Sequence, residues 1–188
     1  VRRALENRPA GSTRSSPYYW LFDGFYAGDT LFIGLLRVAH DDPKGEFQLP
    51  FRPFGVDLAR IENFHEPPSE WQIRITTLSD DLEVIPAASF VVLGEFLHAF
   101  AFIDRGDGRS PRTLLRLPLE ALDVWSPDVS DRVEMLTHGD RWVPMDSEAE
   151  AKILMDDDAT EMSVDPDIAS GRWLSVYSRL PSAHSGQE

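Results

Sequence analysis

The chain contains no cysteine among its 188 residues. This absence excludes disulfide bonds, thiolate metal sites and a cysteine nucleophile. The chain also lacks an excess of basic residues, because its net charge is −14 and its pI is about 4.7. Nucleic-acid binding needs a basic surface to neutralise phosphates, so we expect no nucleic-acid partner. No secretory signal and no membrane-spanning run is visible, and we predict no transmembrane segment.

Several site motifs are also missing. The sequence holds no phosphate loop, no GxGxxG, no GxSxG and no HExxH, and its histidines are not paired at helical spacing. An acidic stretch over 156–158, followed by Asp165 and Asp167, offers oxygen ligands that could bind calcium. Its spacing lacks the EF-hand pattern, so an acidic surface loop is the favoured interpretation and no cofactor is predicted.

What the chain has in quantity is turn residues, with 14 prolines and 12 glycines. Heptad-like apolar stripes are scarce, and the best helical candidate is the short segment Ser147–Lys152. Hydrophobic residues make up 42% of the chain, which is enough for one sizeable core. The composition therefore favours many turns over many helices.

A short pattern of glycine, charge, any residue and leucine occurs three times, at Gly28–Leu31, Gly94–Leu97 and Gly171–Leu174. Aromatic and β-branched runs stand on both sides of each instance, as expected for paired strands. We expect each glycine to supply the positive φ of a hairpin turn. The spacing is too long for a helical-hairpin repeat and suits a multi-strand unit.

The similarity extends past the hairpins. Leu58–Ile61 resembles Leu114–Leu117, which predicts a third strand in each unit, and Trp71–Thr76 and Arg132–Leu136 predict a fourth. Four strands per unit is typical of a β-propeller blade. The alternative is a generic β-sandwich with accidental similarity among its hairpins.

These units predict an all-β fold, a partial β-propeller of four-stranded antiparallel blades. Propellers close with roughly 4–8 blades, so about two and a half blades indicate a fragment. Residues 17–80 and 81–145 are expected to form blades, and 146–180 an incomplete blade. Residues 1–16 are interpreted as a loose linker or inter-blade segment, and 181–188 as a polar tail.

The innermost strand of each blade lines the central channel of a propeller, so its polar residues are the candidate site. The expected ends of the three first strands are Tyr26, Val92 and Val164. Three positions before these ends stand Asp23, Ser89 and Glu161. Glycoside hydrolysis needs at least two carboxylates on a shared channel. Asp23 and Glu161 are therefore the catalytic candidates. Tyr19 and Trp20, which could stack on sugar rings, and Ser89 are the substrate-binding candidates.

Four stretches carry a family resemblance, namely Tyr18–Gly24 with Gly28–Leu31, Leu114–Leu119, and Ala159–Val164 with Gly171–Leu174. Over about residues 17 to 180 the chain resembles the bacterial domain of unknown function 4185, a family similar to five-bladed propellers of the glycoside hydrolase 43 type. The resemblance implies a carbohydrate-active propeller, often secreted or periplasmic. Asp23 would match one of the family's two aspartates, and Glu161 its acid glutamate.

In the blade between these two residues, the sequence departs from the family's pattern. The expected first strand of the second blade carries Ala87, Ala88 and Ser89 but no carboxylate. Three interpretations therefore stay open: a glycoside hydrolase-like enzyme, a non-catalytic carbohydrate-binding propeller, and a protein-interaction propeller.

Overall fold

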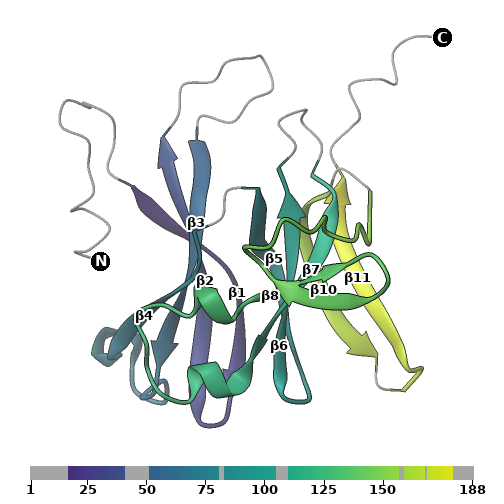
Figure 1. Cartoon of the computed structure of the whole chain (residues 1–188). Helices are drawn as coiled ribbons and strands as arrows, with labels where there is room; N and C mark the ends of the chain where they lie inside the picture. Colours follow the sequence, from purple (N-terminus) through teal and green to yellow (C-terminus); the bar gives the residue numbers. More distant parts are fainter. Residues whose placement is uncertain are drawn as a thin grey trace.

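The computed structural model describes residues 17–40, 51–80, 83–104, 110–156, 159–167 and 169–179. Within these ranges the chain is all-β: three antiparallel sheets and a few short 3-10 helices (Figure 1). The predicted all-β class is therefore confirmed. The best helical candidate of the sequence, Ser147–Lys152, is not helical: it begins with a bend and then forms a bridge between Ala151 and Thr137. The segment is too short to nucleate a helix without a packed apolar face.

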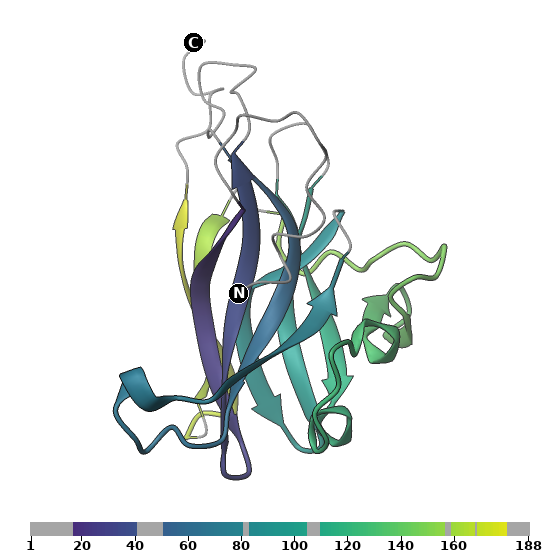
Figure 2. The same cartoon turned by 90° about the vertical axis from the view of Figure 1, so that its left-hand side faces the viewer.

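The first sheet is a four-stranded meander in which every strand pairs with the next along the chain. β1 and β2 are joined by a two-residue turn, as antiparallel neighbours can be. A longer connection that contains the 3-10 helix η2 (Pro68–Glu70) projects from the end of this sheet (Figure 2). The strands are β1 (Tyr18–Ala27), β2 (Thr30–His40), β3 (Phe51–Ile61) and β4 (Ile73–Ser79).

The second sheet has the same meander with one extra strand at its outer edge. Its third strand is followed by a segment with the 3-10 helices η3 (Leu119–Leu122) and η4 (Ser130–Arg132). The strands are β5 (Val84–Leu93), β6 (Phe96–Ile103), β7 (Arg112–Pro118), β8 (Glu134–Thr137) and β9 (Arg141–Pro144). The fifth strand, β9, was not expected from the sequence.

The third sheet, as far as the structure describes it, is a single hairpin of β10 (Ala159–Asp167) and β11 (Arg172–Arg179). The three sheets stand side by side in chain order across Figure 1, with the hairpin in yellow at one end. No closed ring of sheets is present in the described part of the chain.

The turn glycines behave as the repeat predicts. Gly28, Gly94 and Gly171 have φ values of 56°, 60° and 65°. In the first two hairpins the turn is two residues long, since Ala27 pairs with Thr30 and Leu93 with Phe96. Positive φ at these positions matches the right-handed twist of the flanking strands, so this prediction is confirmed.

Two apolar clusters hold neighbouring sheets together. The larger one lies between the first and second sheets and includes Phe32, Leu58, Leu97 and Leu115. The smaller one joins β5 to β10 through Ala88, Val91, Met162 and Val164. Burial of these side chains is the main force that stacks the sheets.

Candidate functional site at the junction of the first strands

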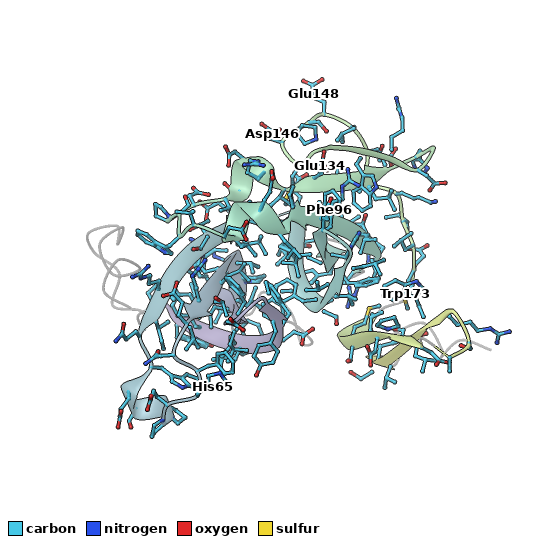
Figure 3. All side chains as sticks on the ribbon, turned by 90° about the horizontal axis from the view of Figure 1, so that it is seen from below. His65, Phe96, Glu134, Asp146, Glu148 and Trp173 are labelled. Carbon is cyan, nitrogen blue, oxygen red and sulfur yellow. The ribbon has the colours of Figure 1, made fainter. Side chains whose placement is uncertain are left out.

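The first strands of the three sheets lie next to one another. β5 packs against β1 on one side and against β10 on the other. In Figure 3, seen from below, the hairpin of the third sheet, which carries Trp173, lies beside the other two sheets. Residues on β1, β5 and β10 that are far apart in sequence are therefore close in space.

Each of the three first strands contains an irregularity in its pairing. The regular register breaks between Leu21 and Gly24 in β1, between Ile85 and Ser89 in β5, and between Ala159 and Met162 in β10. Such bulges bend a strand, redirect its side chains and are frequent beside active sites. Asp23 lies within the first of these irregularities, and Ser89 stands at the end of the second.

Asp23 lies in the bulge of β1, and its carboxylate joins the first sheet to the second. Oδ2 accepts hydrogen bonds from the Ser89 hydroxyl at 2.9 Å and from the Phe90 amide at 2.7 Å. Oδ1 accepts one from the Gly24 amide at 2.8 Å. Three donors therefore hold this half-buried carboxylate in one orientation.

Ser89 extends this connection to the third sheet. Its side chain is 1% exposed, and its hydroxyl oxygen accepts a hydrogen bond from the Val164 amide of β10 at 3.2 Å while it donates to Asp23. One hydroxyl thus links all three first strands. The sequence placed Asp23 and Ser89 at matching positions, and the structure brings them into direct contact.

Glu161 lies in the bulge of β10, and its side chain is outside the part of the chain that the structure describes. The bulges give it the same structural position as Asp23. Counting back from the strand ends gives a different equivalent residue, because β10 continues past its expected end at Val164 to Asp167. Counted from the strand ends, the residue equivalent to Asp23 and Ser89 is Ser163.

Tyr19 and Trp20 point to opposite faces of the first sheet, as consecutive strand residues must. Trp20 is 41% exposed and packs edge-on against Phe51, with ring centroids 4.2 Å apart. Tyr19 instead donates a hydrogen bond from its hydroxyl to Asp57 Oδ2 at 2.8 Å. Of these two residues, Trp20 is the more exposed and presents its ring to solvent.

The partner of Tyr19 belongs to a buried polar cluster that the sequence analysis missed. Asp57 is 3% exposed, and its Oδ1 lies 3.5 Å from Arg37 Nε. Arg37 also donates to the Ser79 carbonyl at 3.0 Å and forms an ion pair with Asp80. The available signal was one acid inside the otherwise apolar run Val56–Ala59, on a strand that follows an arginine-bearing one.

Burial controls the ionisation of this cluster. It raises the pKa of Asp57, and Arg37 and the Tyr19 hydroxyl oppose that increase. Burial also raises the pKa of Tyr19, with a further contribution from the neighbouring Asp57 carboxylate. Tyr19 therefore stays protonated at neutral pH and acts as a hydrogen-bond donor.

The structure describes only some of the possible calcium ligands. Asp157 and Asp158 lie outside the described residues. Asp167 accepts hydrogen bonds from the Ala169 amide and the Ser170 hydroxyl, which fix the hairpin turn. Among the described residues, no three His, Asp or Glu side chains cluster as metal ligands would.

The described part of the chain has no helix of the length and apolarity needed to cross a bilayer. Comparison with known proteins found no matching family model, no matching curated protein and no matching solved structure.

Proposed function

We propose that the three sheets are consecutive blades of a β-propeller. Three features support this arrangement: each sheet begins at the junction of first strands, each meanders outward, and neighbouring sheets stack face to face. Propeller blades have the same up-and-down order around a central axis. In this arrangement β1, β5 and β10 line the axis.

At this axis we propose a carbohydrate-active site of the glycoside hydrolase type. The observation that carries the proposal is the half-buried Asp23 carboxylate at the junction of the first strands, where it accepts hydrogen bonds from Ser89 and Phe90 of β5. Glu161, on β10, is proposed as the second carboxylate. Glycoside hydrolysis requires two carboxylates on either side of the scissile bond. Trp20, exposed further along β1, would stack on a sugar ring.

The two carboxylates have different roles in this proposal. Asp23 is held by three hydrogen-bond donors, which suits a carboxylate that orients groups and stabilises positive charge in the transition state. Glu161 is assigned as the general acid that protonates the leaving oxygen. Ser89 is a positioning residue, since it acts through Asp23.

The test uses the full chain with a panel of arabinose-, xylose- and galactose-containing oligosaccharides. We expect one class to bind by calorimetry and to be cleaved, as measured by released reducing sugar. Glu161→Gln should lower turnover by about 10²- to 10⁴-fold and leave binding unchanged. Trp20→Ala should weaken binding by about tenfold, and Trp173→Ala, which removes a similarly exposed aromatic on β11, should not.

The second candidate is a carbohydrate-binding propeller without turnover. The observation in its favour is that β5 contributes Ser89, and not an acid, to the junction. Binding that depends on Trp20, with no released sugar, would select this candidate. Failure of every glycan to bind would reject both, and turnover unaffected by Glu161→Gln would reject the catalytic assignment.

A further inference from the structure

The second sheet carries an arm that has no counterpart in the first sheet. Its fourth strand, β8, turns back into β9, and the chain returns to the sheet through a bridge between Ala151 and Thr137. The arm is also tied down at Met145, whose amide donates to the Val133 carbonyl at 3.0 Å. Insertions into a repeated unit often form a binding face. The arm is therefore a place to expect a site that the repeat alone does not supply.

Beside the arm lies an arginine that has an equivalent in the first sheet. Arg116 in β7 donates from Nε to Glu134 at 2.6 Å. Arg60 in β3 donates from Nε to Glu62 at 2.9 Å, and its Nη atoms donate to two backbone carbonyls in and just after η3. An arginine in this setting therefore binds uncharged oxygen atoms within the same molecule.

The arm gives Arg116 a second aromatic neighbour. Its guanidinium lies between the rings of Phe96 in β6 and Trp142 in β9, 4.4 Å from each centroid. Its Nη atoms have no hydrogen-bond partner in the described part of the chain. The two rings and Glu134 hold the guanidinium plane in place, so these donors are pre-organised for a ligand.

A hollow of about 350 Å³ lies beside Arg116, which is within the usual range of small-molecule sites, about 300–1,000 Å³. Every residue that lines it belongs to the second sheet or to the segment between β7 and β8. Figure 3 shows two of them, Phe96 and Glu134, near each other on this sheet. The hollow is therefore formed by the second sheet and its arm alone.

The lining combines apolar walls with hydrogen-bonding groups. Arg116 supplies donors, and the carboxylates of Asp131 and Glu134 supply acceptors. The apolar walls are one aromatic ring and two prolines, Phe96, Pro118 and Pro144. A ligand that fits this lining has donors and acceptors along one edge and C–H groups on its faces.

The charges of the hollow balance, which argues against an anionic ligand. Arg116 is paired with Glu134, and Arg132, the other arginine of the lining, is paired with Glu120. The whole chain has a net charge of −14, which disfavours carboxylates and phosphates further. A neutral ligand with several hydroxyl groups agrees best with this chemistry.

We propose that this hollow binds one neutral sugar residue. The Nη atoms of Arg116 donate to a sugar hydroxyl oxygen, Glu134 and Asp131 accept from neighbouring hydroxyls, and the Phe96 ring packs on the C–H groups of the sugar. The site is formed by residues of β6 to β9 and η4 and uses neither Asp23 nor Glu161. It is thus separate from the site proposed at the first strands.

The experiment uses the full chain labelled with 5-fluorotryptophan, titrated with the methyl glycosides of xylose, arabinose, galactose and glucose. Fluorine NMR should show saturable movement of the Trp142 resonance with at least one of them, because Trp142 packs on Arg116. Arg116→Ala and Arg116→Lys should each weaken this binding about tenfold, since lysine keeps the charge but lacks the planar fork. The methyl glycoside of galacturonate should bind more weakly than that of galactose.

The matched control is Arg141→Ala, which removes an exposed arginine on β9 and should leave binding unchanged. Unchanged Trp20 and Trp71 resonances before titration show that each arginine variant is folded. Trp20→Ala alters the site at the first strands and should leave the titration of Trp142 intact, so failure of one site is distinguishable from failure of the other.

A Trp142 resonance that none of the four glycosides moves, or that moves equally in both Arg116 variants, overturns the proposal. Tighter binding of the galacturonate glycoside would assign the hollow to anions, and movement on concentrating the protein alone would assign it to a second copy. Loss of the movement in Trp20→Ala would assign the binding to the first strands. Each of these three results also overturns the proposal.

Discussion

Arg60 and Arg116 share a sequence context, a strand position and a glutamate partner, yet one is 11% exposed and the other 23%. The glutamate contacts are local, because Glu62 follows Arg60 closely and Glu134 lies on the strand paired with β7. The Nη contacts of Arg60 instead reach carbonyls of the next sheet. The repeated sequence therefore determines the strands and local contacts within each sheet. The neighbouring sheet determines how much of each face is buried.

The difference in burial between the two faces should have its largest effect on the free energy of unfolding when the leucines beside the arginines are truncated. Leu58 is fully buried between the first two sheets, whereas its equivalent Leu114 is only half-buried. Leu58→Ala should lower the free energy of unfolding by about 2–5 kcal/mol, the usual loss for a buried leucine. Leu114→Ala should cost clearly less, and urea denaturation measures both. Equal losses would mean that the two faces are equally covered.

The arginines themselves give the next effect. Arg60→Ala removes two donors from backbone carbonyls and should lower the free energy of unfolding by about 2 kcal/mol. Arg116→Ala removes a partly exposed ion pair and should cost about 1 kcal/mol or less. Thermal and urea unfolding of both variants provide the comparison. A larger loss for Arg116→Ala would contradict the uncovered state of its face.

Much of the fold could be predicted because turns and strands leave local signals. Gly28, Gly94 and Gly171 marked the hairpins, and Leu58–Ile61 and Leu114–Leu117 marked the third strands. Strand β9 was missed because it spans only Arg141–Pro144 and lacks a repeat partner in the first sheet. Its pairing with β8 depends on the turn between them.

The candidate site could be predicted only in part. Counting back from two equal turns placed Asp23 and Ser89 at matching strand positions, but the hydrogen bond between them was not predicted. The same count was uncertain at Glu161, because the third hairpin has a longer turn and β10 extends to Asp167. The cluster around Asp57 depends on strand register, since Tyr19 pairs with Arg37 across β1 and β2. Register arises from packing of whole sheets and is not written in any short motif.

The smallest expected effect is the pH dependence of the Asp57 cluster. Burial raises the folded-state pKa of Asp57 above its ordinary value of 3.8, so the native state binds this proton more tightly than the unfolded chain. Its contribution to stability is therefore present at low pH and lost as pH rises through the folded pKa. Asp57→Asn, which cannot ionise, should gain stability relative to wild type between pH 4 and pH 7.

Urea unfolding of both proteins across that range measures this difference. A wild-type protein that gains stability over Asp57→Asn as pH rises would contradict the assigned direction.

The most direct test of the comparison is NMR of the arginine guanidinium groups in ¹⁵N-labelled protein, assigned with Arg60→Lys and Arg116→Lys. Both Nε protons should be observed, since both arginines pair with a glutamate through Nε. The Nη protons of Arg60 should give resolved, slowly exchanging signals, and those of Arg116 should exchange rapidly with water. Nη protons of Arg116 protected as well as those of Arg60 would contradict the open face on the second sheet.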